Sequence, residues 1–385
     1  MTRPALPDLP GLLAPFRLGP LTLPNRLAVA PMTRISATDD GVPTAAMARY
    51  YARFARGGFG LVITEGIYTD CAYAQGYANQ PGLTDMAQAL AWRDVVRAVH
   101  AGGGRIVAQL MHAGALSQAN RFRGDTVGPS AVRPVGEQMR VYAGTGPYRM
   151  PRAMTEAEIG DAVAGFARAA TLAREVAGFD AVEIHGANGY LLDQFLTGHT
   201  NQRTDRWGGD IQDRVRLAVE TAHAVRAAVG AGFPLGIRIS QGKVNDFHHK
   251  WPEAAQGAAT VFGALAGAGV DYLHVTEFEA WRPAFPGDPS SLVEHARRAA
   301  PGLPIVANGG LHDTARALEV LRQGADLVAL GRGALANPDF PGRLAAALQP
   351  RPFDPALLSP LGNLKPGEVT EEEHAGRVTA QPAAG

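Results

Sequence analysis

Short apolar runs and amphipathic stretches alternate along this chain from residue 27 to residue 348. Continuous apolar runs of five to seven residues are typical of strands that are buried on both faces. The pattern predicts eight such strands, at residues 27–31, 61–65, 105–110, 179–185, 235–240, 272–276, 304–308 and 326–330. Between and after them, apolar residues recur at helical spacing. These stretches predict helices at residues 44–56, 86–101, 155–177, 213–229, 252–268, 290–300, 313–323 and 338–348.

Eight strands that are each followed by a helix predict an α/β fold, a (β/α)8 TIM barrel. We expect a single barrel domain over residues 11–350 and a C-terminal extension over residues 351–385. A doubly wound open sheet is the alternative, and it would place a GxGxxG turn after its first strand. Here MTRISATDDG follows that strand, whereas the run Gly57-Gly58-Phe59-Gly60 precedes a strand and is interpreted as a helix stop.

Two regions depart from the regular alternation. Residues 113–154, between strands three and four, form a long excursion rich in Gly, Pro and Arg. Loops of this length are usually functional. Thr155 and Glu158 then form a capping box that opens the next helix. The tail beyond Gly362 is polar and rich in Glu and Gly, and we expect it to be mobile and partly disordered.

Composition narrows the class of partner. Apolar residues make up 46% of the chain, charged residues 19%, and the formal net charge is zero. Because no net field favours nucleic acid or an anionic membrane, a small-molecule substrate is expected. The lone Cys71 excludes an internal disulfide, a cysteine-based zinc site and an iron–sulfur cluster. Without a signal-like or membrane-spanning run, we expect a soluble, cytoplasmic protein. We also expect a monomer or homodimer.

In a barrel enzyme the active site lies at the carboxyl ends of the strands. Polar residues and glycines, with one proline and two methionines, gather at these ends in this sequence. They are Pro31, Met32, Thr33, Gly66, Gln109, Met111, His185, Asn188, Tyr190, Arg238, Asn308, Gly309, Gly310, Gly331 and Arg332. The histidines elsewhere, such as His248 and His249, lack an HExxH spacing, so no metal site is predicted.

The loops after strands seven and eight favour phosphate binding. Barrels often hold phosphate there, and glycines let backbone N–H groups approach an anion. Gly309, Gly310 and Gly331 supply the glycines, and Arg332 supplies a guanidinium suited to bidentate contact. The alternative is that these glycines only permit tight turns.

Strand four ends in the cluster His185, Asn188 and Tyr190. A His–Asn pair can donate two hydrogen bonds to one oxygen, and a protonated Tyr can act as a general acid. Together they predict a site that polarises a carbonyl group and then protonates the substrate. Gln109 and Arg238 indicate a planar, electron-rich ligand, although an ion pair of Arg238 with Glu183 or Glu277 is an open alternative.

Several motifs together resemble one family. NRLAVAPMTR, VAQLMHAG, HGANGYLLDQFL, IRIS and the late NGG, LGR and NPD resemble the old yellow enzyme family of FMN-dependent ene-reductases over residues 15–341. With Thr33 the chain resembles the classical branch of this family, whereas another branch carries Cys at that position.

The resemblance implies a bound FMN at the mouth of the barrel and NADPH or NADH as its reductant. It implies flavin contacts by Pro31, Met32, Thr33, Gly66, Gln109 and Arg238 and phosphate contacts by Asn308, Gly309, Gly310, Gly331 and Arg332. It further implies that His185 and Asn188 bind the carbonyl oxygen of an α,β-unsaturated substrate. Hydride would pass from flavin N5 to the β-carbon, and Tyr190 would protonate the α-carbon, with ping-pong kinetics.

The sequence also departs from the family pattern. Met111 stands where many members have Trp, the loop 241–251 follows no standard pattern, and Phe353 is the one candidate for an aromatic residue over the substrate. Two alternatives remain. One is a relative of the 2,4-dienoyl-CoA reductases without the iron–sulfur domain, which the single cysteine opposes. The other is a non-catalytic flavin- or phosphate-binding barrel, which the His185–Asn188–Tyr190 cluster opposes.

Overall fold

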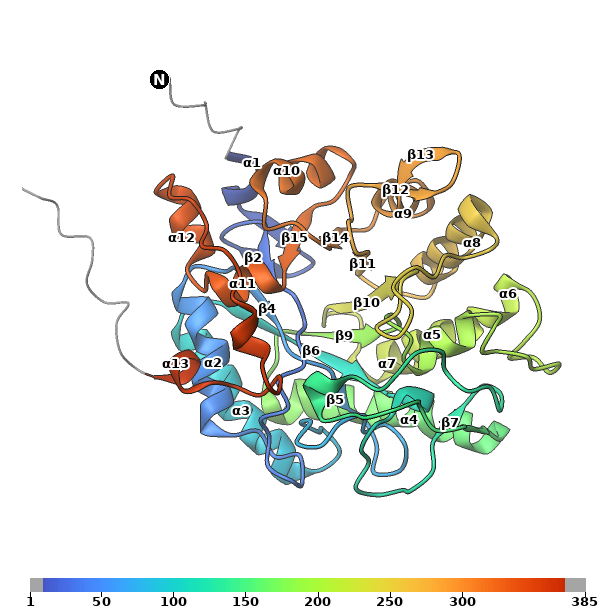
Figure 1. Ribbon diagram of the computed structural model, residues 1–385. Helices are drawn as coiled ribbons and strands as arrows, with labels where there is room; N and C mark the ends of the chain where they lie inside the picture. Colours follow the sequence, from blue (N-terminus) through green and yellow to red (C-terminus); the bar gives the residue numbers. More distant parts are fainter. Residues whose placement is uncertain (1–9, 371–385) are drawn as a thin grey trace, which may run out of the picture.

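A closed ring of eight parallel strands forms the centre of the computed structural model, which describes residues 10–370 (Figure 1). The strands are β3 (Leu27–Val29), β4 (Leu61–Ile63), β6 (Arg105–Met111), β9 (Ala181–His185), β10 (Leu235–Ser240), β11 (Tyr272–Thr276), β14 (Ile305–Asn308) and β15 (Leu327–Leu330). Each strand pairs in parallel with the next, and β15 pairs with β3 to close the ring. The predicted (β/α)8 barrel is therefore confirmed.

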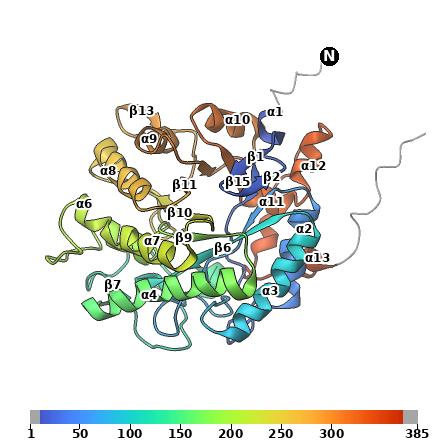
Figure 2. The same cartoon turned by 180° about the vertical axis from the view of Figure 1, so that it is seen from behind.

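The helices lie outside the ring, as the view from behind shows (Figure 2). They are α2 (Ala45–Arg56), α3 (Met86–Ala101), α4 (Glu156–Leu172), α7 (Arg216–Val229), α8 (Ala254–Gly267), α9 (Leu292–Ala299), α10 (Thr314–Arg322) and α12 (Phe340–Ala345). The predicted capping box is present at the start of α4, where Thr155 accepts from the backbone of Glu158 and the Glu158 carboxylate accepts from the backbone of Thr155. Among residues 10–370, every helix is too short or too polar to cross a membrane.

Two apolar layers stabilise the barrel. Side chains inside the ring, such as Leu61, Val107 and Val306, form one buried cluster with Leu18 and Leu23. The latter two belong to a hairpin, β1 (Phe16–Leu18) and β2 (Leu21–Leu23), that the sequence pattern did not predict. A larger cluster fills the space between the strands and the surrounding helices. Buried faces on both sides explain why the strands are continuous apolar runs.

Several short elements were also absent from the prediction. After the strand ends lie β5 (Ile67–Tyr68), α5 (Leu191–Leu196), β12 (Pro283–Phe285), β13 (Asp288–Ser291) and α11 (Arg332–Ala336). The predicted helix 213–229 begins earlier in the structure, as the short helix α6 (Ile211–Arg214) followed by α7. The excursion contains only η1 (Gly114–Leu116), β7 (Val127–Gly128), η2 (Arg140–Tyr142) and β8 (Arg152–Ala153). Elements of two to six residues carry too little periodicity to be recognised in a sequence.

The C-terminal segment, residues 351–370, packs against the barrel. It contains η4 (Pro355–Leu358) and α13 (Pro366–Val369), and α13 contacts α2. Within it, Glu368 forms a buried ion pair with Arg34, at 2.5 Å between Nη2 and Oε2. The prediction of a mobile tail beyond Gly362 is wrong for residues 363–370, because these contacts hold them in place. Residues 371–385 lie outside the described part of the chain.

Candidate active site

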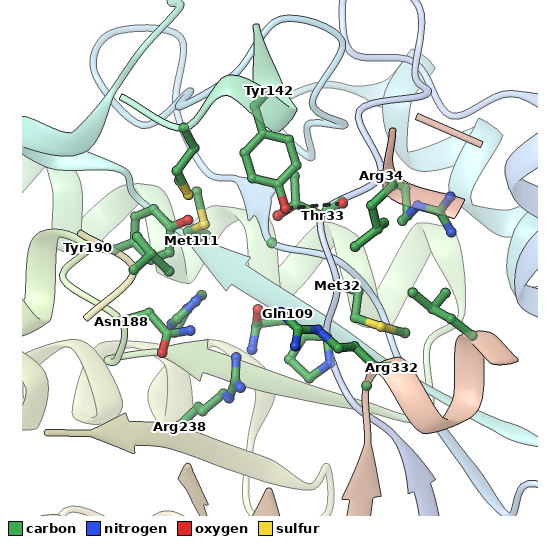
Figure 3. A pocket seen from close by; sticks show the side chains of 18 residues that line it. Met32, Thr33, Arg34, Gln109, Met111, Tyr142, Asn188, Tyr190, Arg238 and Arg332 are labelled. Atoms are coloured by element: carbon green, nitrogen blue, oxygen red, sulfur yellow. Dashed lines mark hydrogen bonds between the residues drawn. The ribbon is translucent and has the colours of Figure 1, made fainter. Parts of the chain in front are cut away.

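Two adjoining cavities lie at the carboxyl ends of the barrel strands. The first has a volume of about 260 Å³ and the second about 540 Å³, and they share Asn188, Val244, Gly331 and Arg332 in their walls. All fifteen site residues predicted from the sequence line one or both cavities. Figure 3 shows the labelled side chains of the first cavity, which come from strands β6 and β10 and from loops and short helices that follow strand ends. The strand ends bring these residues together, although they lie up to 301 positions apart in the sequence.

Strand four and its turn contribute the polar cluster of the first cavity. His185 is the last residue of β9, and its Nδ1 accepts a hydrogen bond from the backbone N–H of Ala187 at 3.3 Å. This bond fixes the tautomer, so that Nε2 carries the proton. Burial, together with the nearby charge of Arg238, lowers the pKa of His185 well below its usual value. At neutral pH His185 is therefore an uncharged hydrogen-bond donor.

Asn188 is held in a conformation that few residues adopt. Its φ of 63° lies in the left-handed region, which asparagine tolerates better than most residues. Its backbone N–H donates to Ser240 Oγ at 2.8 Å, and its carbonyl accepts from the backbone of Val244 at 3.1 Å. Strand β10 and the following loop, 241–251, therefore fix this residue from both sides.

A buried ion pair supports the same turn. The carboxylate of Asp193 accepts from the backbone N–H of Gly189 at 2.6 Å and from Lys243 Nζ at 2.7 Å. Asp193 is fully buried and Lys243 nearly so. The loop whose sequence matched no standard pattern thus anchors the turn that carries Asn188 and Tyr190.

Tyr190, two residues after Asn188, also lines the first cavity. Its ring lies 4.9 Å from the His185 ring, and its hydroxyl lies 2.5 Å from the hydroxyl of Tyr77. Burial raises the pKa of Tyr190, so the hydroxyl keeps its proton at neutral pH. This is the protonation state that a general acid needs.

Arg238 is buried without an acidic partner. Its Nη2 donates to Asn308 Oδ1 at 2.8 Å and to Thr276 Oγ1 at 3.2 Å, while its Nε has no hydrogen-bond partner within residues 10–370. Burial lowers the pKa of Arg238 to about 10, which still leaves it charged at neutral pH. The predicted alternative, an ion pair with Glu183 or Glu277, is not formed, because Glu183 pairs with His274 and Glu277 with Lys250.

The barrel floor orients Gln109. Its amide Nε2 donates to Glu183 Oε1 at 2.8 Å, and Glu183 also accepts from His274 and Tyr272. Because the amide nitrogen faces the floor, the Gln109 carbonyl oxygen faces the cavity as an acceptor. A planar ligand above Gln109 and beside Arg238 would therefore meet one acceptor and one fixed cation.

The second cavity contains the predicted phosphate-binding residues. Gly309 and Gly310 have φ values of 134° and 66°, and a Cβ on Gly309 would lie 1.8 Å from the carbonyl oxygen of Glu277. Both glycines are thus required by the turn itself. The side chain of Asn308 contacts Arg238 and the carbonyl of Ala329, so it buttresses the arginine. Within residues 10–370 Arg332 forms no ion pair, and its guanidinium lies 5.8 Å from the ring of Phe353.

The sequence did not predict that the excursion 113–154 forms one wall of the first cavity. Tyr142 and Met139 line the first cavity, and the Tyr142 hydroxyl donates to the carbonyl of Thr33 at 3.4 Å (Figure 3). Tyr142 thus forms an aromatic wall of the first cavity, whereas Phe353, the candidate from the sequence, does not line this cavity. No local pattern in an irregular 42-residue excursion distinguishes Tyr142 from its neighbours.

Comparisons with known proteins agree with this architecture. Residues 11–350 match the NADH:flavin oxidoreductase / NADH oxidase family. The chain is 37% identical to the chanoclavine-I aldehyde reductase fgaOx3 of Penicillium roqueforti, over 90% of this chain and 92% of that protein. It is 35% identical to a probable flavin mononucleotide-dependent alkene reductase of Leishmania infantum, over 91% and 94%.

Solved structures show the same similarity. An old yellow enzyme homologue from Zymomonas mobilis superimposes with a TM-score of 0.83 and 32% identity, over 94% of this chain and 99% of that one. Morphinone reductase, in complex with tetrahydroNAD, superimposes with a TM-score of 0.81 and 35% identity, over 94% and 97%. The chain belongs to the NADH:flavin oxidoreductase / NADH oxidase family, which includes the old yellow enzymes.

Proposed function

We propose that this protein uses NAD(P)H and bound FMN to reduce the C=C bond of α,β-unsaturated carbonyl compounds and related activated alkenes. The observation that carries the proposal is the cluster at the end of β9. A neutral His185 with a free Nε2–H, the Asn188 side chain and a protonated Tyr190 line one cavity. This set suits an acceptor that must be polarised at oxygen and protonated at carbon.

The residues of the two cavities fit FMN. Arg238 has an unpaired, buried Nε, which a ligand with an electron-rich ring edge would satisfy. Gln109 presents an acceptor beside it. The second cavity adjoins the first and ends at Gly309 and Gly310, where backbone and Arg332 suit a phosphate. FMN held by these residues would supply the hydride-transfer chemistry between NAD(P)H and the alkene.

The chain's own residues bind the substrate and move the proton. His185 Nε2–H and the Asn188 amide donate to the carbonyl oxygen, which withdraws electrons from the β-carbon. The Tyr190 hydroxyl gives its proton to the α-carbon. The charge of Arg238 would stabilise negative charge on the edge of a flavin ring bound beside it. Met111 and Tyr142 form walls of the first cavity and thereby limit the shape of the substrate.

Three measurements test this function. We expect the purified protein to be yellow and to release FMN on acid treatment. NADPH or NADH should bleach the bound flavin under anaerobic conditions, and an enone, maleimide or nitroalkene should restore its colour. Protein that stays colourless with added FMN, or reduced protein that no alkene re-oxidises, would exclude the proposal.

The two alternatives find less support. A barrel that only binds flavin has no need of a neutral histidine and a buried tyrosine hydroxyl in one cavity. A dienoyl-CoA-reductase-like enzyme would need an iron–sulfur domain, for which one cysteine is too few. Membership of the Thr33 branch and a monomeric or homodimeric state stay predictions.

A further inference from the structure

A second tyrosine lies directly behind the predicted proton donor. The hydroxyl oxygens of Tyr77 and Tyr190 are 2.5 Å apart, and both residues are buried, with 0% and 4% of their surface exposed. Tyr190 lines the first cavity, whereas Tyr77 does not. Tyr77 follows β5 and lies 113 residues before Tyr190, so only the folded barrel brings the two together.

The direction of this hydrogen bond follows from counting protons. Each tyrosine hydroxyl carries one proton. Within residues 10–370, Tyr190 is the only hydrogen-bond partner of the Tyr77 hydroxyl, and Tyr77 has no access to solvent. A bond in the opposite direction would leave the Tyr77 proton unsatisfied in the interior, at a free-energy cost. Tyr77 therefore donates, Tyr190 accepts, and the Tyr190 proton is free to face the cavity.

The surroundings of Tyr77 keep it in this role. Its ring packs on Tyr142 at a centroid distance of 4.6 Å, and its carbonyl accepts from Gln75 Nε2 at 3.1 Å. Burial raises the pKa of Tyr77 well above its usual value, so it stays a donor at all physiological pH values. The hydroxyl is thus fixed in position and in protonation state.

We propose that Tyr77 is a positioning residue for proton transfer, which aims the Tyr190 proton into the cavity and stabilises the oxygen that loses it. This inference rests on the proposed function. Hydride addition at the β-carbon breaks the C=C π bond and leaves its electron pair at the α-carbon, delocalised onto the carbonyl oxygen. This pair then takes the Tyr190 proton, so the O–H bond of Tyr190 breaks and a C–H bond forms at the α-carbon. The electron pair of that O–H bond stays on the Tyr190 oxygen, where the Tyr77 O–H donates to it, and a proton from solvent restores Tyr190 before the next turnover.

The central variant is Tyr77→Phe, made in the wild type and in a Tyr190→Phe background. We expect it to slow re-oxidation of the reduced protein by 2-cyclohexenone roughly 10- to 100-fold, the effect of losing a hydrogen bond to a developing charge. Flavin reduction by NAD(P)H should be unchanged. Re-oxidation by ferricyanide, which forms no C–H bond, should also be unchanged. In the Tyr190→Phe background, Tyr77→Phe should add less than a twofold effect.

Tyr148 offers a matched control. It belongs to the same buried cluster, and its hydroxyl has no hydrogen-bond partner within residues 10–370. Tyr148→Phe should therefore leave re-oxidation by 2-cyclohexenone within about twofold of wild type. A loss as large as that of Tyr77→Phe would assign the effect to packing and overturn the proposal.

Three further outcomes would overturn the proposal, and a fourth would refute the proposed function. Additive losses in the double variant, or no loss in Tyr77→Phe, would overturn the proposal. The hydrogen bond can also be measured without turnover, from the Cζ resonance of Tyr190 in ¹³C-tyrosine-labelled protein. An unchanged resonance in Tyr77→Phe would overturn the proposal even if re-oxidation slows. Wild-type protein that reduces no alkene would instead refute the proposed function, which is a distinguishable result.

Discussion

The Glu368→Gln substitution would remove one charge from the ion pair that joins the C-terminal segment to the first cavity. Arg34 directly follows Thr33, and both its Nη atoms donate to the Glu368 carboxylate, at 2.7 and 2.5 Å. Neither side chain is more than 3% exposed. Removing one partner of a buried pair costs about 3–5 kcal/mol, because the other charge stays buried. Arg34 keeps its bonds to the carbonyls of Gly362 and Asn363, so we expect the lower value.

This cost translates into a measurable shift of the unfolding temperature. At about 2.1 cal/mol/K per residue, the unfolding entropy of residues 10–370 is about 0.8 kcal/mol/K. A loss of about 3 kcal/mol therefore lowers Tm by about 4 °C in thermal unfolding followed by circular dichroism. The matched control is Glu319→Gln, which breaks an exposed pair with Arg322 and should lower Tm by about 1 °C or less.

The pH dependence of Tm tests whether the ion pair of Glu368 with Arg34 causes this difference. Burial alone would raise the pKa of Glu368, but the hydrogen bonds and charge of Arg34 hold it below its usual value. The stabilisation is therefore fully present above about pH 4.3, the unfolded value, and is lost as pH falls through the lower folded pKa. The wild type and Glu368→Gln should converge in acid. An equal Tm at pH 7, or a difference that persists unchanged in acid, would refute this reasoning.

Three other predictions address the site. Tyr190→Phe should slow enone reduction roughly 100-fold or more while flavin reduction by NAD(P)H stays normal, as stopped-flow absorbance would measure; equal losses would make Tyr190 structural. His185→Ala or Asn188→Ala should weaken phenol binding to the oxidised protein roughly 10- to 100-fold in a charge-transfer titration; retained affinity would contradict the carbonyl-binding role. Lys243→Met should cost about 3–5 kcal/mol in denaturant unfolding, and adding Asp193→Asn should restore much of it; no restoration would mean that the unpaired buried charge is not the cause.

The barrel was predictable because its determinants are local. Strands buried on both faces must be apolar throughout, and the surrounding helices must carry an apolar stripe. The prediction matched β10 and β11 and the helix α3 at both ends. The hairpins β1–β2 and β12–β13 escaped it, because strands of three or four residues with one exposed face resemble ordinary loops. The predicted helix 213–229 is divided into α6 and α7 at Val215, which no sequence signal marks.

The fifteen site residues at the strand ends were predictable for a geometric reason. Once a closed parallel barrel is established, all strand ends meet at one face, so residues as distant as Thr33 and Arg332 must be neighbours. Residues on loops obey no such rule. Tyr77 and Tyr142 approach the site from irregular segments whose paths depend on tertiary contacts. Their positions could therefore be read only from the structure.

Lys243 illustrates this limit most clearly. A lysine in a polar loop is exposed in most proteins, and nothing in QGKVND marks it as buried. Its partner Asp193 lies 50 residues earlier, on the helix that follows the turn with Asn188 and Tyr190, and both side chains are buried. A buried pair of this kind adds little net stability, but its strict geometry can select one conformation. Here that conformation is the turn that presents Asn188 and Tyr190, so the loop with the least recognisable sequence determines where the most recognisable motif lies.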